Sequence, residues 1–283
     1  MSTTSEENDK TELRPYEIGR FIFLPNHKIH CLYIRIKPKY LHVPGVLKEI
    51  LEILSKRNIS IVHFKMPRPY ENQPIEFLIF VDLTNINKDT INTIIKELKE
   101  MEYAEQVECI EPVIDGLSAY NKLFPLTMFN KRVVIFRKPV YEALLKKLPQ
   151  KWGWGVRAFL YYLGKEVGTN VYKDLKNIIR QIHPTKEDKS LLIKISEVLF
   201  TQVGFGMIEI INIDYKNHKA TVRVYHSFEC ELFQKEDKPA SHLIRGIIAG
   251  WLSAFFNKNI DCEETKCIAK GDPYCEFITV KSN

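Results

Sequence analysis

The spacing of apolar and polar residues divides the first part of the chain into alternating strand-like and helix-like segments. The pattern predicts a strand at 30–36, an amphipathic helix at 46–58, β-rich runs at 59–66 and 75–83, a second helix at 90–101 and a short strand at 107–112. A Pro-containing loop separates the two β-rich runs, so we expect them to pair as an antiparallel hairpin. Asn87 or Asp89 is the expected cap of the second helix.

The second part of the chain is mixed in the same way. We expect a short strand at 132–136, helices at 139–148, 153–175 and 192–203, strands at 206–215 and 219–232, an apolar helix at 242–256, and a closing strand, turn and strand over 261–280. Glycines recur inside two of these helices, where they lower intrinsic helicity, so we expect close packing by a neighbouring element at Gly164, Gly168, Gly246 and Gly250.

The predicted elements indicate an α+β protein with two domains. The order strand, helix, strand, strand, helix, strand over residues 29–113 is that of a ferredoxin-like βαββαβ module. Residues 114–129 carry turn residues without clear periodicity and are expected to be a linker, and residues 130–283 form the second, mixed α/β domain. A length of 283 residues agrees with two domains.

Composition narrows the class of protein. Apolar residues make up 45% and charged residues 27% of the chain, which is ordinary globular composition. Residues 1–28 are expected to be a disordered polar tail. No segment approaches the ~20 apolar residues of a membrane span, so we expect a cytoplasmic protein without membrane insertion. The net charge of +6 is spread over lysines scattered among glutamates, which leaves DNA binding open but without a clustered basic face.

The segment VPGVLKEILEILSKRNISI resembles the opening of ACT domains, in which a Pro-Gly pair precedes the first helix. The resemblance implies an effector that approaches the backbone at Gly45, because glycine has no side chain in the way. Members that bind amino acids often carry Asp or Asn two residues before the proline, where this chain has His42. The alternative is a module used only for pairing with a second copy, and we expect a homodimer.

The second domain resembles the 4-vinyl reductase domain. The resemblance is carried by RGIIAGWLSAFF, EETKCIAKGDPYCEF, HSFEC and GVRAFLYYLGKEVG. Relatives of this family share an enclosed apolar pocket rather than a reaction, which implies an apolar, aromatic or lipid-like small-molecule ligand. The candidate ligand-binding residues are seven aromatic residues and one histidine that could hydrogen-bond a polar group of the ligand: Trp154, Phe159, Tyr162, Phe205, Tyr225, His226, Phe228 and Trp251.

The same resemblance makes zinc a candidate cofactor. Glu264, Cys267 and Cys275 have the spacing of three zinc ligands in phenol-sensing relatives, and two thiolates with a carboxylate suit a structural zinc site. The family position of the fourth ligand is Ser241, a poor zinc ligand, with His242 and Cys230 as substitutes that do not fit that position. The alternative is that the cysteines are packed as small apolar side chains.

These patterns favour a sensor over an enzyme. The chain has no nucleotide-binding glycine loop, no G-x-S-x-G elbow and no H-E-x-x-H helix. We therefore expect a non-catalytic small-molecule sensor that regulates a partner protein or transcription. Two alternatives stay open, a transcriptional regulator that binds DNA itself and a redox or reductase enzyme.

Overall fold

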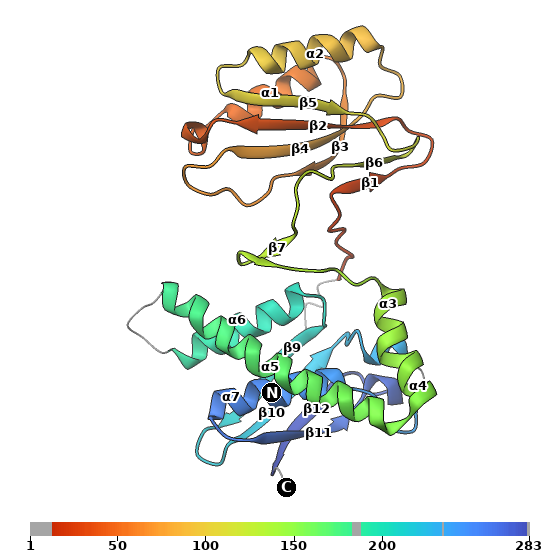
Figure 1. Ribbon diagram of the computed structural model, residues 1–283, viewed down its shortest axis with the longest axis vertical. Coiled ribbons are helices and arrows are strands. Elements are labelled where there is room, and N and C mark those ends of the chain that lie inside the picture. The colour runs from red at the N-terminus through yellow and green to blue at the C-terminus, as the bar shows by residue number, and fades with distance from the viewer. Residues whose placement is uncertain (1–12, 183–187, 234, 282–283) are drawn as a thin grey trace, which may run out of the picture. The chain divides into compact units, whose positions relative to one another are not determined.

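A computed structural model describes residues 13–182, 188–233 and 235–281. The chain divides into two compact units, Met1–Val134 and Ile135–Asn283, which are described separately (Figure 1). Residues 1–12 of the expected disordered tail lie outside the described residues.

Unit 1 is built on one four-stranded antiparallel sheet with two helices on one face. Its elements are β2 (Ile29–Ile36), α1 (Val46–Ser55), β3 (Ser60–Lys65), β4 (Ile75–Asp82), α2 (Lys88–Glu100) and β5 (Ala104–Ile110), with a 3₁₀ turn η1 (Pro38–Tyr40) before α1. The strands lie in the order β3-β4-β2-β5, and β3 pairs with β4 as the hairpin pattern predicts. Asn87 is the cap of α2, since its side chain accepts the backbone N–H of Thr90 at 2.8 Å.

Alternation along the central strands sends side chains to both faces of this sheet. Leu32 and Ile34 of β2 pack with Ile50 and Ile94 of the helices. On the other face, a second buried cluster contains Tyr33 and Phe80 together with residues from outside the βαββαβ stretch.

That other face is covered by residues that the sequence assigned to a disordered tail and a linker. β1 (Phe21–Phe23) pairs antiparallel with β6 (Leu117–Ala119), and Ile22 and Tyr120 pack on the cluster. The Tyr120 ring stacks on Tyr33 with centroids 4.8 Å apart. The tail and linker predictions are therefore wrong for these two strands, because short apolar runs within polar surroundings gain enough burial to form an ordered ribbon.

The region that ends unit 1 also departs from expectation. A small hairpin joins β7 (Thr127–Met128) to β8 (Lys131–Arg132), while residues 133–136 have no strand structure. The strand predicted at 132–136 is wrong over most of its length. Its β-branched residues favour strands, but no neighbouring strand is present among the described residues to pair with them.

Unit 2 consists of a second four-stranded antiparallel sheet with several helices. The order is α3 (Lys138–Glu142), a π-helical turn η2 (Ala143–Lys147), α4 (Leu148–Trp152), α5 (Trp154–Ile182), α6 (Lys189–Gln202), β9 (Met207–Asp214), β10 (Lys219–Tyr225), η3 (Cys230–Leu232), α7 (Leu243–Phe256), β11 (Ile260–Lys266), η4 (Ile268–Lys270) and β12 (Cys275–Lys281). The sheet order is β11-β12-β10-β9.

The long helix α5 and the apolar helix α7 pack backbone against backbone. A Cβ built on Gly168 would lie 2.0 Å from the carbonyl oxygen of Ile247, and one built on Gly246 would lie 2.1 Å from that of Tyr161. The close packing predicted from the glycine spacing is confirmed. Gly153, with φ of +73°, forms the corner between α4 and α5.

Over the part of the chain that the structure describes, none of the helices combines the length and the apolar character that a bilayer crossing requires.

Candidate functional site

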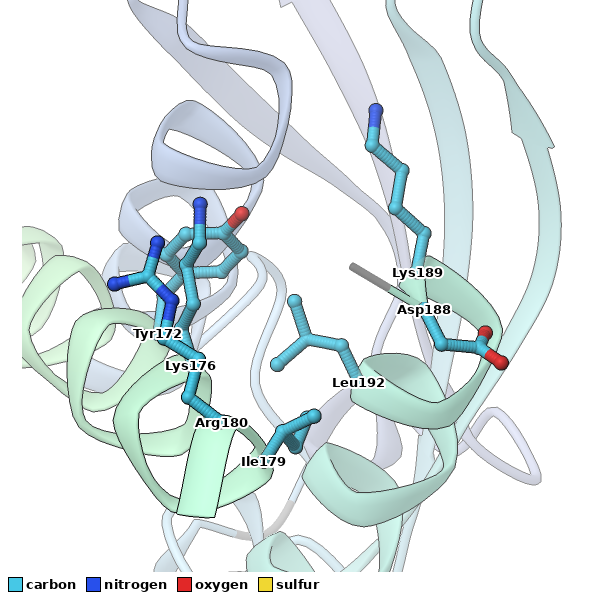
Figure 2. Close-up of a pocket in the computed structure, with 7 residues that line it drawn as sticks. All are labelled: Tyr172, Lys176, Ile179, Arg180, Asp188, Lys189 and Leu192. Carbon is cyan, nitrogen blue, oxygen red and sulfur yellow. The ribbon is translucent and has the colours of Figure 1, made fainter. Parts of the chain in front are cut away.

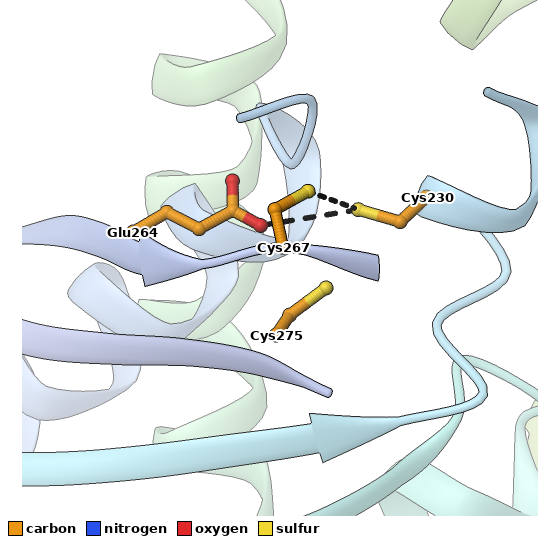
Figure 3. Close-up of side chains that lie close together, drawn as sticks. All are labelled: Cys230, Glu264, Cys267 and Cys275. Atoms are coloured by element: carbon orange, nitrogen blue, oxygen red, sulfur yellow. Dashed lines mark hydrogen bonds between the residues drawn. The ribbon is translucent and has the colours of Figure 1, made fainter. Parts of the chain in front are cut away.

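Four buried side chains converge where the sheet of unit 2 meets the loop after β10 (Figure 3). Cys230 comes from η3, Glu264 from β11, Cys267 from the residue before η4, and Cys275 from the start of β12. Their ligand atoms all lie within 4.8 Å of one another. The Sγ of Cys230 is 3.5 Å from the Sγ of Cys267 and 3.9 Å from Oε1 of Glu264.

The turn between β11 and β12 positions three of these residues. Asp272 accepts the backbone N–H of Cys267 at 2.8 Å, and Gly271 adopts φ of +100°, a left-handed conformation that favours glycine. A register shift between Glu264 and Lys266 bends β11 at the same place. The Gly-Asp turn therefore brings Cys267 and Cys275 to the same side of the sheet end as Glu264.

The geometry fits a four-coordinate metal ion. Zinc bound to cysteine has Zn–S distances of about 2.3 Å, which places neighbouring ligand atoms of a tetrahedron roughly 3.8 Å apart. The separations of 3.5 Å and 3.9 Å are close to that value. Three sulfurs and one carboxylate oxygen are donors that suit zinc. Since all four ligands come from the protein and all are buried, the arrangement corresponds to a closed structural site.

Electrostatics inside this cluster oppose full ionisation of its members. A hydrogen bond from the Cys230 thiol to Cys267 lowers the pKa of Cys267 and raises that of Cys230. Burial, followed by the proximity of Cys267, raises the pKa of Glu264 to about 8. Four acidic groups so close together in a buried place can all be ionised only when a cation lies among them.

Ser241 supports the carboxylate of this cluster. Its backbone N–H donates to Oε2 of Glu264 at 3.0 Å and its hydroxyl donates to Oε1 at 2.9 Å. The backbone N–H of Ile268 also points at the Sγ of Cys275, at 3.4 Å. Hydrogen bonds of this kind orient ligating groups around metal ions.

The structure supplies the fourth ligand that the sequence left unassigned. Cys230, considered as a substitute, joins Glu264, Cys267 and Cys275, while Ser241 lies beside the carboxylate. His242 is outside the cluster. Spacing pointed to Ser241 because it counts residues along the chain, whereas Cys230 enters from the separate turn after β10. The HSFEC motif was the signal that contained it.

A buried glutamate next to this ligand was missed by the sequence reasoning. One carboxylate oxygen of Glu229 accepts the backbone N–H groups of His242 and Leu243 at 2.8 and 2.9 Å, and the other accepts that of Ile244 at 2.8 Å. Burial raises the pKa of Glu229 to about 7, against the lowering effect of these three donors. Glu229 thus caps the N-terminus of α7 from 13 or more residues away.

A shallow pocket lies between α5 and α6 (Figure 2). It has about 370 Å³ of non-atom space, open solvent included. Apolar and charged side chains share its lining: Tyr172, Lys176, Ile179, Arg180, Asp188, Lys189 and Leu192. Asp188 also caps α6, because its carboxylate accepts the backbone N–H groups of Ser190 and Leu191.

None of the eight candidate ligand-binding residues lines this pocket. Trp154, Phe159 and Tyr162 lie on the outer face of α5, where 82%, 58% and 65% of their surface is exposed. His226 has a left-handed backbone in the turn after β10 and lies within 4.0 Å of Glu231 at the surface. The expected pocket contacts are therefore absent at these four positions, because helical spacing does not reveal which face of α5 packs on α7.

The remaining candidates are packed in aromatic clusters. Phe205 stacks on Phe228 with ring centroids 5.1 Å apart, and Tyr225 meets Tyr274 edge to face at 5.4 Å. Trp251 is closest to the pocket, since its ring contacts Tyr172 at 5.8 Å.

Gly45 begins α1 in the left-handed region, with φ of +98°, and a Cβ there would meet nothing within 4 Å. The turn itself requires glycine, and an effector role at Gly45 stays a prediction.

Comparison with known proteins places a family in unit 2. The family model of the vinyl-4-reductase domain matches residues 220–281. Two uncharacterized proteins of Methanocaldococcus jannaschii are 27% identical over 129 residues and 30% identical over 162 residues. The matches cover 44% and 54% of this chain and span 65% and 59% of those relatives' own lengths.

Two solved structures are similar to about half of the chain. The phenol-responsive sensory domain of the transcription activator PoxR with phenol is 18% identical with a TM-score of 0.45, covering 53% of this chain and 76% of that one. A vinyl-4-reductase family protein from Methanocaldococcus jannaschii is 19% identical with a TM-score of 0.36, covering 53% and 85%. On the family match over residues 220–281, the C-terminal unit of this chain contains a vinyl-4-reductase domain.

Proposed function

We propose that this protein is a non-catalytic small-molecule sensor whose C-terminal unit holds a structural zinc ion and binds an apolar ligand. The observation that carries the proposal is the vinyl-4-reductase domain match over residues 220–281, which contains all four residues of the buried metal cluster. The family resemblance described above implies binding of an apolar molecule in this domain.

The zinc ion would have a structural role in this proposal. Cys230, Glu264, Cys267 and Cys275 would hold it, and with four protein ligands no coordination position is left for a substrate. Such an ion ties the turn after β10 to both terminal strands. Its binding free energy would then stabilise the folded form of the sheet end.

The pocket between α5 and α6 is the proposed entrance for the ligand. Its apolar residues Tyr172, Ile179 and Leu192 lead to Trp251, whose indole N–H donates to the hydroxyl of Ser196 on α6 at 3.1 Å. A ligand that moves α6 would also move β9, because Glu197 of α6 accepts the backbone N–H of Ile210 at 2.9 Å. Regulation follows if the ligand binds one arrangement of α6 better than another.

Unit 1 is proposed to be an ACT-like, ferredoxin-like regulatory module that pairs two copies of the chain. The strand order β3-β4-β2-β5 supports this proposal, since each pair of helix-linked strands encloses one strand of the other pair. The ribbon of β1 and β6 covers the helix-free face of the sheet, so pairing would use a strand edge or the helices.

Native mass spectrometry of the full chain purified from its own host tests the sensor proposal. We expect a retained apolar molecule, or binding of one from a panel of alkylphenols and fatty acids. Leu192→Trp would fill the pocket and lower the affinity by about tenfold or more, whereas Val198→Trp, on an exposed position of the same helix, should leave it unchanged. A chain that carries no such molecule and binds none of the panel would overturn the proposal.

A further inference from the structure

The outer face of α5 and the corner before it expose a group of large apolar side chains that neither the pocket nor the metal cluster uses. Trp152 and Trp154 flank the corner at Gly153 and are 68% and 82% exposed. The group is Leu148, Trp152, Trp154, Phe159, Tyr162 and Leu163, and we call it the α4–α5 patch. A group of neighbouring apolar side chains this exposed marks an interaction surface.

The packing of α5 fixes this patch on the outside of unit 2. Gly164 and Gly168 face α7 at backbone contact, where a Cβ on Gly164 would lie 2.3 Å from the carbonyl oxygen of Leu243. At about 100° per residue, Phe159 and Tyr162 lie roughly 140° and 160° around the helix from Gly164. Turning them inward would break the glycine contact, so their exposure follows from the fold.

Positive charge surrounds the patch. Residues 143–165 contain no Asp or Glu and five cationic residues, Lys146, Lys147, Lys151, Arg157 and Lys165, compared with a net charge of +6 for the whole chain. The expectation of evenly scattered charge is therefore wrong for this stretch.

Not all of these cations are turned to solvent. Lys146 donates to the carbonyl of Leu232 at 2.6 Å, and Lys165 forms an ion pair with Asp261 at 2.7 Å. Lys147, Lys151 and Arg157 are exposed. Each lies within five residues of Trp152, so the apolar patch and the exposed cations form one surface.

The combination of charges and side-chain types selects among partners. A second copy of the chain paired through the same patch by a two-fold axis would bring like charges together, which disfavours that arrangement. Nucleic acid would use the cations and stack on the Trp rings, but it has no use for the aliphatic Leu148 and Leu163. An anionic lipid surface uses all three: Trp at the headgroup level, aliphatic side chains at the acyl boundary and cations on the phosphates.

We propose that the α4–α5 patch docks unit 2 peripherally on an anionic lipid bilayer. Trp152, Trp154 and Leu148 enter the interface, and Lys147, Lys151 and Arg157 contact lipid phosphates. This docking is independent of the proposed sensor function, because none of the patch residues lines the pocket.

Sedimentation of the full chain with vesicles of phosphatidylglycerol or of phosphatidylcholine tests the proposal, with tryptophan fluorescence as the second readout. Two of the three tryptophans are exposed and Trp251 is buried, so binding should shift the emission to the blue and protect it from iodide. We expect binding to phosphatidylglycerol that weakens with salt, and at least about tenfold weaker binding to phosphatidylcholine.

Surface variants locate the binding. Lys147→Gln with Lys151→Gln should lower the affinity for phosphatidylglycerol about tenfold or more, and Trp152→Ser with Trp154→Ser should abolish the blue shift. Lys194→Gln with Lys216→Gln removes two exposed lysines elsewhere in unit 2 and should change the affinity less than about twofold. All these residues are exposed, and circular dichroism melts check that the variants remain folded.

Four outcomes would overturn the proposal. They are no binding to phosphatidylglycerol, equal binding to both lipids, tighter binding to an oligonucleotide at the same phosphate concentration, and a dimer in light scattering that the tryptophan variants dissociate. The last two would assign the patch to nucleic acid or to a second copy.

Discussion

A methyl group placed on Gly250 would lie 1.9 Å from the carbonyl oxygen of Lys165, closer than any real side chain approaches a backbone atom. The helices α5 and α7 meet at this point with no side chain between them. Because the obstructing atom belongs to the backbone of a 29-residue helix, it cannot move without displacing that helix.

Gly250→Ala should therefore destabilise unit 2 by about 3 kcal/mol or more, since the two helices must separate to admit the methyl group. Gly155→Ala is the matched control in α5, where a Cβ meets nothing within 4 Å. It should leave stability unchanged or raise it by up to about 1 kcal/mol, because alanine is the better helix former. Urea unfolding measures both, and equal effects of the two substitutions would contradict the packing argument.

The glycine contact shows which parts of the fold are readable from sequence. The spacing of Gly246 and Gly250 in an apolar helix, and of Gly164 and Gly168 in another, predicts close approach because nothing else compensates their cost to helicity. The ribbon of β1 and β6 was not readable. Its strands are three residues long and pair across almost one hundred residues, so local patterns carry no trace of their partnership.

Glu229 should be essential to the start of α7. Glu229→Gln keeps the shape but replaces one acceptor oxygen by an N–H₂ group that faces backbone N–H donors, and it removes the negative charge at the helix N-terminus. We expect a loss of about 2–3 kcal/mol in urea unfolding. Glu231→Gln, two residues further on at an exposed position, should be nearly silent. A Glu229→Gln variant as stable as the wild type would show that the cap contributes little.

Aromatic residues gave the least reliable site predictions. Their types are the same in a core, a pocket and a docking surface, so Trp154 and Trp251 look alike in sequence although one is exposed and the other is buried. The metal ligands were easier to find, because Glu264, Cys267 and Cys275 follow each other through one turn. Cys230 comes from another turn, and only the fold brings it to them.

The stability of unit 1 should fall as the pH is lowered below about 6.5. Burial lowers the pKa of His30 in the folded protein, with Lys28 acting in the same direction and Glu111 against it. Between the unfolded pKa, near 6.5, and the lower folded pKa, the unfolded chain binds a proton that the folded chain does not, so stability decreases with falling pH. Below the folded pKa this contribution no longer changes.

His30→Gln should reduce that pH dependence. Thermal melts of the wild type and of the variant between about pH 7.5 and pH 5 compare the two slopes directly. If both lost stability equally over this interval, the buried imidazole of His30 would not be the group responsible.

The metal cluster gives the sharpest comparison, because unit 2 contains a buried cysteine outside it. Cys230→Ala removes one of four ligands, so zinc content measured by elemental analysis should fall from about one equivalent to near zero. The unfolding free energy should fall by several kcal/mol, since metal binding energy becomes folding energy. Cys262→Ala, at a buried cysteine on β11 outside the cluster, should retain zinc and cost roughly 1 kcal/mol for a small cavity. Glu264→Gln should weaken zinc binding in the direction of Cys230→Ala. If the wild type purified without chelator contained less than about a tenth of an equivalent of zinc, or if Cys230→Ala and Cys262→Ala were equally mild, the four side chains would be a packed core rather than a metal centre.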